Sequence, residues 1–149
     1  MRAVVQLVSQ ASVTVDQETT GAINDGLVVF LGIGKDDTEK DARYLVEKIA
    51  HLRIFPDGDT LMNRSILDIQ GEMLIISQFT LYGDCRKGRR PSYSRAARPE
   101  QAAILYHYFI QETTHLGIRT ATGRFQAMMK VSLVNDGPVT IMLDSKKPF

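Results

Sequence analysis

The chain has 149 residues, a formal net charge of +1 and a single cysteine, Cys85. This length suits one domain, and 44% hydrophobic with 23% charged residues is typical of a folded soluble protein rather than a disordered or fibrous one. One cysteine excludes an internal disulfide framework and a thiolate-cluster metal site, which fits a reducing compartment. The longest apolar run, Leu27–Leu31, is far shorter than the roughly 18 residues of a membrane span. We therefore expect one cytoplasmic domain over residues 1–149, without a membrane segment.

The first third of the chain has the pattern of β-strands. Arg2–Val8 and Ala11–Val15 are rich in valine, and Thr19–Ile23 follows as a candidate hairpin partner. After a turn at Asn24-Asp25-Gly26, the segment Leu27–Ile33 is continuously apolar. Such a run predicts a central strand that is buried on both faces.

Two segments have helical spacing of apolar residues. Lys35–Leu52 predicts a helix, with Asp36 and Glu39 at the spacing of a capping box. A second helix is expected to begin at Pro99 and to stop at Gly117, because proline favours the first helical position and glycine the position after the end.

The other apolar segments are short and predict strands, and Tyr82–Ala97 predicts a long loop. Strands and helices do not alternate strictly, which favours an α+β fold with antiparallel sheet and helices on one side. The remaining expected strands are Arg53–Phe55, Met73–Leu81, Ile118–Thr122, Ala127–Val134 and Val139–Leu143.

The densest positive charge lies inside this loop, at Arg86, Lys87, Arg89 and Arg90. A flexible basic loop can follow a phosphate backbone without reading sequence, but it can equally be a solvated surface loop. The residues alone leave both interpretations open. Cys85 beside these cations is best interpreted as an incidental thiol, because no histidine is near it in the sequence.

Common catalytic constellations are missing. His51, His107 and His115 do not have the spacing of metal ligands, and no glycine-rich nucleotide fingerprint occurs, so we expect neither metal nor cofactor. The hydroxyls of Ser77 and Thr80 lie at the end of a predicted strand, where a nucleophile would need an activating base. No base is evident, which favours hydroxyls that bond to their own backbone.

The segment Asn135–Thr140, with the sequence Asn-Asp-Gly-Pro-Val-Thr, separates two predicted strands. A hairpin turn is the simpler interpretation, because Asn, Asp and Gly accept turn dihedrals. A cis Gly137–Pro138 bond would instead turn backbone carbonyls into a compact wall. The sequence does not choose between them.

Taken together, these segments resemble the D-aminoacyl-tRNA deacylase family, homodimeric editing enzymes that remove D-amino acids from tRNA. The resemblance runs nearly end to end. Its two signatures are Ser77–Leu81 and Asn135–Thr140, and finding both in this order is highly specific. The other matching segments are Val4-Val5-Gln6, Ala11-Ser12-Val13, Gly32, Lys35-Asp36-Asp37, Arg53-Ile54-Phe55, Met62-Asn63, Gly88, Arg90-Pro91-Ser92, Thr122-Gly123-Arg124-Phe125 and Val131–Val134.

The resemblance implies mainly antiparallel sheets that form a barrel-like core with two longer helices, in a homodimer with active sites at the interface. A cis Gly137–Pro138 bond would reach into the partner's site. Its carbonyls would clash with the side chain of an L-residue and spare a D-residue, and glycine, without a side chain, would also be accepted. Mischarged glycyl-tRNA is therefore an expected second substrate.

The resemblance also implies the site residues. Ser77, Gln78, Phe79 and Thr80 would surround the ester that joins the amino acid to the terminal ribose, with Met129 in the pocket. The 2′-hydroxyl of the tRNA would assist the attack of water, and N–H groups near Phe79 and Thr80 would stabilise the oxyanion. Thr80 as a nucleophile is the lower-ranked alternative. The basic loop would bind tRNA phosphates.

One residue departs from the family pattern. Leu7 stands where the family usually has an arginine that orients the Gly-Pro carbonyls, so we expect weaker chiral discrimination than in a Leu7→Arg variant.

Two other functions compete with editing. One is a non-catalytic RNA-binding dimer with a decayed site, and the other is a hydrolase of free D-amino-acid esters that needs no RNA.

Overall fold

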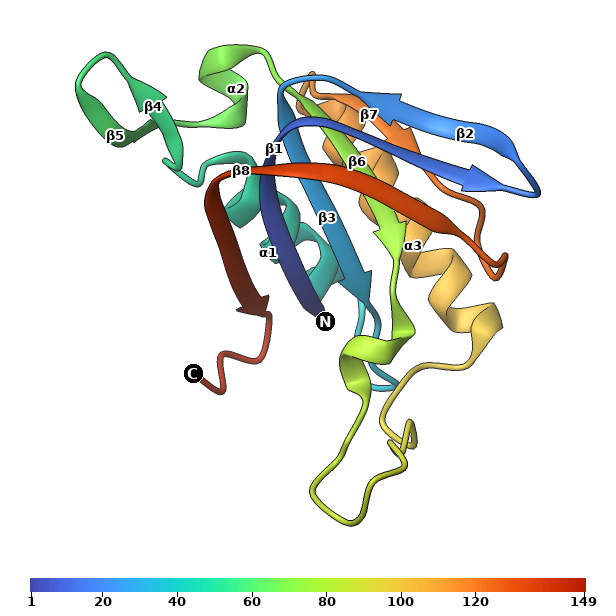
Figure 1. Ribbon diagram of the computed structural model, residues 1–149. Helices are drawn as coiled ribbons and strands as arrows, with labels where there is room; N and C mark the ends of the chain where they lie inside the picture. The colour runs from blue at the N-terminus through green and yellow to red at the C-terminus, as the bar shows by residue number, and fades with distance from the viewer.

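The computed structural model describes residues 1–149 and contains eight strands, three α-helices and one 3₁₀ turn (Figure 1). The strands are β1 (Arg2–Val15), β2 (Glu18–Ile23), β3 (Gly26–Gly32), β4 (Phe55–Asp57), β5 (Thr60–Arg64), β6 (Glu72–Ser77), β7 (Arg119–Thr122) and β8 (Lys130–Asp144). The helices are α1 (Glu39–Ala50), α2 (Ile66–Ile69) and α3 (Pro99–His115), and η1 (Phe79–Tyr82) is the 3₁₀ turn. None of the helices is long and apolar enough to cross a bilayer.

Six of the strands form one mixed sheet. β1 pairs antiparallel with β2, β3 and β8, whereas β3 pairs parallel with β6, and β6 parallel with β7. Parallel neighbours need long crossover connections, and the chain between β3 and β6 contains α1 whereas the chain between β6 and β7 contains α3. The α+β class and the two longer helices are confirmed, while the expectation of mainly antiparallel sheets holds only for the part of the sheet around β1.

The sheet curls until its two edge strands meet. A Cβ on Gly21 in β2 would lie 2.6 Å from the carbonyl oxygen of Thr122 in β7, so the two backbones approach more closely than any other residue would permit. No ladder pairs these edges. The result is the expected barrel-like core, nearly closed, with α1 and α3 on one side of it (Figure 1).

Two hydrophobic clusters lie on opposite faces of the central strands. The helix-side cluster packs β3 residues such as Leu27 and Leu31 against α1 and α3, and the barrel cluster packs Val28 of β3 and Ile76 of β6 inside the barrel. Strand β3 is thus buried on both faces, which explains its continuous apolar run. The prediction of a central strand there is confirmed.

Strand β1 passes from one cluster to the other. Leu7 belongs to the helix-side cluster and Val8, the next residue, to the barrel cluster. Successive strand residues normally point to opposite faces, so both can be buried only because the sheet has a core on each side.

Strand β8 makes the same change of cluster beside β1. Val131 and Leu133 pack against the barrel cluster, whereas Ile141 and Leu143 pack against the helix-side cluster. Between Val8↔Asn135 and Gln6↔Thr140, four residues of β8 oppose one residue of β1, which is a bulge. Of the two interpretations left open for Asn135–Thr140, the hairpin turn is wrong, because β8 stays antiparallel to β1 on both sides of this segment and bends there (Figure 1).

Some local expectations also need correction. Helix α1 begins at Glu39, not Lys35, and its capping pair is Thr38 with Asp41 rather than Asp36 with Glu39. The Asp41 carboxylate accepts the backbone N–H of Thr38 at 2.9 Å, which satisfies one of the free donors at a helix start. The second helix begins at Pro99 as predicted, and Gly117 follows its end with a φ of +88°.

Candidate active site

Ser77 lies at the carboxyl end of the parallel part of the sheet. It is the last residue of β6 and pairs with Leu31 of β3. The next residue, Gln78, donates its N–H to the carbonyl of Leu31 at 2.8 Å. Carboxyl ends of parallel strands are where α/β sheets usually bind ligands, because backbone groups there lack ladder partners. The first signature is thus at a sheet edge suited to binding.

The strand predicted to reach Leu81 ends four residues earlier. From Phe79 the chain forms the turn η1, in which Leu81 donates to the carbonyl of Gln78 at 3.2 Å and Gly83 to that of Thr80 at 2.9 Å. The prediction of a strand that extends to Leu81 is therefore wrong beyond Ser77. The first N–H groups of such a turn have no acceptor within it, so those of Phe79 and Thr80 are free of the turn's own bonds.

An aromatic pair stands beside this turn. The ring of Phe79 is 59% exposed and meets the ring of Tyr93 edge to face, with 5.0 Å between centroids. Tyr93 comes from the long loop that follows η1. The loop therefore covers part of the strand end, and sequence spacing alone could not show this because the two residues are far apart in the chain.

Arg2 fixes the turn to the rest of the sheet. Its Nη1 donates to the carbonyl of Leu81 at 3.0 Å, and its Nε donates to Asp144 at 3.0 Å. The guanidinium also lies 4.5 Å from the centroid of the Tyr82 ring. Burial, reinforced by the nearby Asp37 carboxylate, raises the pKa of Tyr82, so its phenol stays neutral. Arg2, itself in β1, therefore connects β1 to β8 and to η1. The sequence analysis did not identify this role of Arg2.

The site hydroxyls have no activating base within the chain. The Thr80 hydroxyl accepts a hydrogen bond from Gln78, and no imidazole or carboxylate bonds to it or to Ser77. His51 bonds to the carbonyl of Glu47 at the end of α1, away from β6. No group of three or more His, Cys, Asp or Glu side chains is placed to hold a metal ion.

Met129 lies near the same end of β6. Its side chain packs against the barrel cluster, which includes Ile76, the residue before Ser77. A Cβ on Gly123 would collide with the sulfur of Met129 and would lie 3.5 Å from Ile76. The structure thus places Met129 close to the strand end that carries the first signature.

The second signature is remote from the first within one chain. Gly137 and Pro138 are exposed in the bulge of β8, beside Leu7 of β1, and the bond between them is cis. Strands β1 and β3 separate this bulge from β6, which amounts to three inter-strand spacings of about 4.8 Å each. Across the sheet, Leu7 of β1 pairs with Leu27 of β3, which pairs with Met73 of β6. The bulge is therefore also displaced along the strands, because Met73 lies four residues before Ser77. One chain does not bring the two signatures together.

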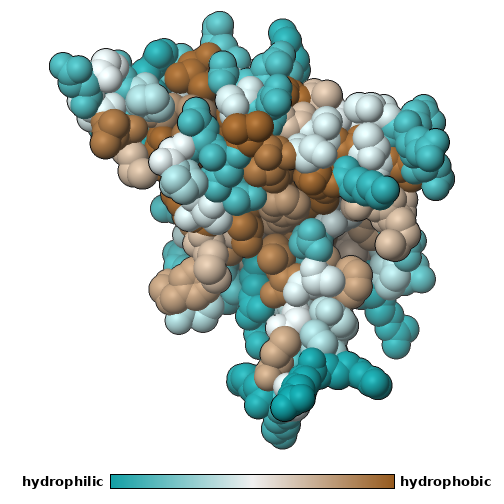
Figure 2. Space-filling model, in the orientation of Figure 1, coloured by the Kyte–Doolittle hydropathy of each residue, from teal (hydrophilic) through white to brown (hydrophobic).

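The basic loop projects from the sheet below η1 (Figures 1 and 2). Arg86 is bound to Asp84 through contacts of 2.6 and 2.9 Å, and these hydrogen bonds hold the pKa of Asp84 below its ordinary value. Lys87, Arg89 and Arg90 are exposed, as is Cys85. Three of the four predicted cations are therefore unengaged, while Arg86 is paired within the loop.

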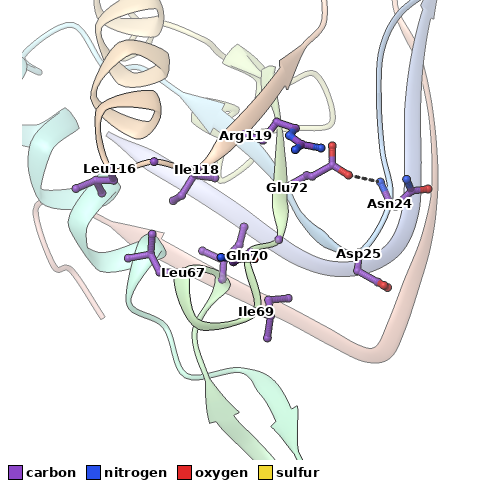
Figure 3. A pocket seen from close by; sticks show the side chains of 12 residues that line it. Asn24, Asp25, Leu67, Ile69, Gln70, Glu72, Leu116, Ile118 and Arg119 are labelled. Carbon is purple, nitrogen blue, oxygen red and sulfur yellow. Dashed lines mark hydrogen bonds between the residues drawn. The ribbon is translucent and has the colours of Figure 1, made fainter.

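A cavity lies at the other end of the sheet. It has a volume of about 690 Å³ and is lined by residues that include Glu72 and Arg119, the first residues of β6 and β7, and Leu116 at the end of α3 (Figure 3). Glu72 accepts the N–H of Asn24 there at 3.2 Å. None of the site residues predicted in the sequence analysis lines this cavity.

Comparisons with known proteins identify the family to which the chain is similar. The model of the family described as D-Tyr-tRNA(Tyr) deacylase matches residues 4–144. The chain is 61% identical to D-aminoacyl-tRNA deacylase of Koribacter versatilis and 56% identical to that of Thermotoga petrophila, in each case over the whole of both chains.

Two solved structures have the same fold. The c-Myc DNA unwinding element binding protein superposes with a TM-score of 0.90 at 42% identity, covering 97% of this chain and 98% of that one. A probable eukaryotic D-amino acid tRNA deacylase superposes with a TM-score of 0.83 at 20% identity, covering 96% and 98%.

Proposed function

The chain belongs to the D-Tyr-tRNA(Tyr) deacylase family of hydrolases, and we propose that it cleaves the ester bond of D-aminoacyl-tRNA in the cytoplasm, releasing D-amino acid and tRNA. The observation that carries this proposal is the combination of family membership with the exposed strand end at Ser77–Thr80. An ester carbonyl can approach there without crossing the core. The proofreading role follows, because the product is an uncharged tRNA that can be charged again.

In the proposed mechanism the backbone and the substrate do the chemistry. In this mechanism the N–H groups of Phe79 and Thr80, which the turn leaves free, stabilise the developing oxyanion, and Gln78 with Ser77 orients the ester. The 2′-hydroxyl of the terminal ribose positions the attacking water. The absence of a base bonded to either site hydroxyl supports this assignment over a covalent Thr80 mechanism.

A Thr80→Ala variant separates the two mechanisms. If the substrate's 2′-hydroxyl assists water, the turnover of D-tyrosyl-tRNA stays within about tenfold of wild type, since only one polar contact is lost. A covalent mechanism requires loss of nearly all turnover. Trapping of an acyl-enzyme on Thr80 by mass spectrometry would contradict the proposed route.

Chiral selection is assigned to Gly137 and Pro138 of a second subunit. The large separation between the bulge and Ser77 within one chain supports a site completed by a partner, in a symmetric dimer with two equal sites. Backbone carbonyls of this segment would exclude the side chain of an L-residue. Glycyl-tRNA would pass the same test and be a second substrate.

The outer face of the sheet has the character of a subunit interface. Val134 and Met142 of β8 are 47% and 64% exposed, and Met142 is beside Val4 of β1. Apolar side chains gather on the middle of this face, where β8 crosses the sheet in Figure 1 (Figure 2). Exposed apolar surface next to the Gly137–Pro138 bulge supports a homodimer that buries both.

The unengaged cations Lys87, Arg89 and Arg90 are the proposed contacts to tRNA phosphates, with Arg86 contributing only after release from Asp84. They lie on the loop that follows η1, so a bound acceptor stem would lead into the strand end. No base-specific contact is needed for such binding.

The deciding experiment compares D-tyrosyl-, L-tyrosyl- and glycyl-tRNA with purified protein and no added metal. Release of D-Tyr and Gly with L-Tyr spared supports the editing function. Release of all three alike would mean that chiral rejection fails in this chain. No release would favour the RNA-binding dimer, and activity on small D-amino-acid esters without a ribose would favour the RNA-independent hydrolase.

A further inference from the structure

The bulge of β8 is bracketed by two polar side chains, Asn135 and Thr140. Asp136, Gly137 and Pro138 between them are exposed, and they oppose only Leu7 on β1. A segment with so few ladder partners needs another source of order if it is to exclude a substrate.

The Asn135 side chain supplies such contacts. With its amide nitrogen turned toward β1, Asn135 donates to the carbonyl of Leu7 at 2.9 Å and to the carbonyl of Val139 at 3.0 Å. Its amide oxygen accepts from Gln6 Nε2 at 3.1 Å and from the Thr140 hydroxyl at 3.0 Å. A primary amide has two N–H donors and two acceptor sites, so every one of them is used.

The partners of Asn135 are mutually consistent. Gln6 Nε2 also donates to the Thr140 hydroxyl at 3.1 Å, and that hydroxyl still has its own hydrogen to donate to Asn135. The network joins the strand before the bulge, the strand after it and β1. It therefore fixes both ends of the exposed segment by one side chain.

We infer that Asn135 is the positioning residue that holds Gly137 and Pro138 in the orientation that rejects L-aminoacyl esters, an inference that rests on the proposed function. The Leu7 side chain is 7% exposed, belongs to the helix-side cluster and has no polar group to orient a carbonyl. Asn135 bonds instead to the main-chain carbonyl of Leu7, which is present whatever side chain stands there. The amide network thus anchors the bulge to β1 and to the chain after Pro138 without a charged side chain at position 7.

The test measures the ratio of kcat/KM for D-tyrosyl-tRNA to that for L-tyrosyl-tRNA in four proteins. Asn135→Ala is expected to lower this ratio about tenfold or more, since both bonds to carbonyls are lost. Thr140→Val is expected to lower it less, since the hydroxyl bonds to Gln6 and Asn135 are lost but the bonds from Asn135 to the two carbonyls remain. Ser132→Ala is the matched control. Ser132 is an exposed residue of the same strand with no side-chain bond to the bulge, so wild-type and control ratios should agree.

Hydrogen–deuterium exchange of the peptide that spans 135–140 gives a readout that is independent of catalysis. Faster exchange there in Asn135→Ala, with unchanged exchange in the rest of β8, is expected. A folded Asn135→Ala protein with a wild-type ratio and wild-type exchange would overturn the inference. If Asn135→Ala does not fold, a Thr140→Val protein with a wild-type ratio and wild-type exchange overturns it as well. If the wild-type protein does not prefer D-tyrosyl-tRNA to L-tyrosyl-tRNA, the proposed chiral function is refuted instead. Faster hydrogen–deuterium exchange of residues 135–140 in Asn135→Ala would in that case still show that the Asn135 hydrogen bonds order the bulge.

Discussion

The two signature segments differ in how the fold holds them. Ser77–Thr80 continues a buried parallel strand and is tied by main-chain bonds, such as that from Gln78 to Leu31, and by Arg2. The Gly137–Pro138 bulge is exposed on an antiparallel strand and is tied by one amide side chain. The first segment therefore depends on the integrity of the sheet, whereas the second can be loosened without unfolding it. Catalysis and chiral selection should be separable by mutation.

The largest effect is expected at Gly137. Its φ is +111°, and a Cβ there would lie 2.8 Å from Val139, so Gly137→Ala must displace the segment. We expect kcat/KM for D-tyrosyl-tRNA to fall about 100-fold, because a displaced wall obstructs the site. Gly58→Ala is the control, since Gly58 also has positive φ but no atom within 4 Å of an added Cβ. Equal kinetics for both variants would contradict the role of the bulge.

Arg2→Ala tests the strand end. It removes the bond to the Leu81 carbonyl and leaves the buried Asp144 carboxylate without this partner. We expect kcat for D-tyrosyl-tRNA to fall about tenfold with an unchanged D:L ratio, because η1 shifts while the wall stays in place. Arg43→Ala, which removes an exposed arginine that bonds Tyr108, should change neither value. A changed D:L ratio in Arg2→Ala would show that the two regions are coupled.

The basic loop should affect binding alone. Lys87→Ala, Arg89→Ala and Arg90→Ala are each expected to raise KM about two- to fivefold and to reduce its salt dependence, since each removes one phosphate contact. Arg86→Ala should change KM less, because Arg86 is paired with Asp84. The largest KM effect at Arg86 would contradict this assignment.

Lowering the pH should destabilise the contacts of Asp41 with the residues that follow β8, without changing the D:L ratio. Burial opposes ionisation of Asp41, but hydrogen bonds from Lys146 and Ser145 lower its pKa below the ordinary value. Because the unfolded state binds this proton more readily, Asp41 contributes stability above about pH 4 that is lost as the pH falls through its folded pKa. Urea unfolding from pH 6 to pH 3 should show a shallower loss in Asp41→Asn than in wild type. An equally steep loss in both would contradict the stabilising role of the carboxylate.

The smallest effect is expected at Leu7. The family resemblance implies stricter rejection of L-tyrosyl-tRNA in Leu7→Arg, but Asn135 already bonds the carbonyl of Leu7 opposite the bulge and that of Val139 within it. We expect a rise in the D:L ratio of about threefold or less, since one added donor competes with bonds already made. An unchanged D:L ratio in Leu7→Arg would show that an arginine at position 7 adds nothing to the order that Asn135 gives the bulge. A rise above tenfold would show that the arginine orders the bulge more strongly than Asn135 does.

Local patterns in the sequence predicted the elements whose cause is local. The apolar run of β3 and the Pro99 start of α3 were recognised because burial on both faces and helix initiation leave short-range patterns. The end of β6 at Ser77 was missed because η1 is held by Leu31 and Arg2, which are distant in the sequence.

The bulge of β8 was missed for a related reason. Asn-Asp-Gly-Pro has the composition of a turn, and nothing in it reveals that Gln6 and Leu7 lie alongside. The site residues themselves were identified by resemblance to a family rather than by spacing. Spacing could not identify them because the proposed site consists of main-chain groups and remote strands rather than a motif of titratable side chains.

The central claim is that each active site takes its strand end from one subunit and its Gly137–Pro138 segment from the other. The direct test mixes two impaired variants, Gly137→Ala and Arg2→Ala, under conditions of subunit exchange. If the site spans the dimer, one site in each mixed dimer has both wild-type segments, and activity on D-tyrosyl-tRNA should recover to about a quarter of wild type. Mixed dimers that form but remain inactive would contradict the claim.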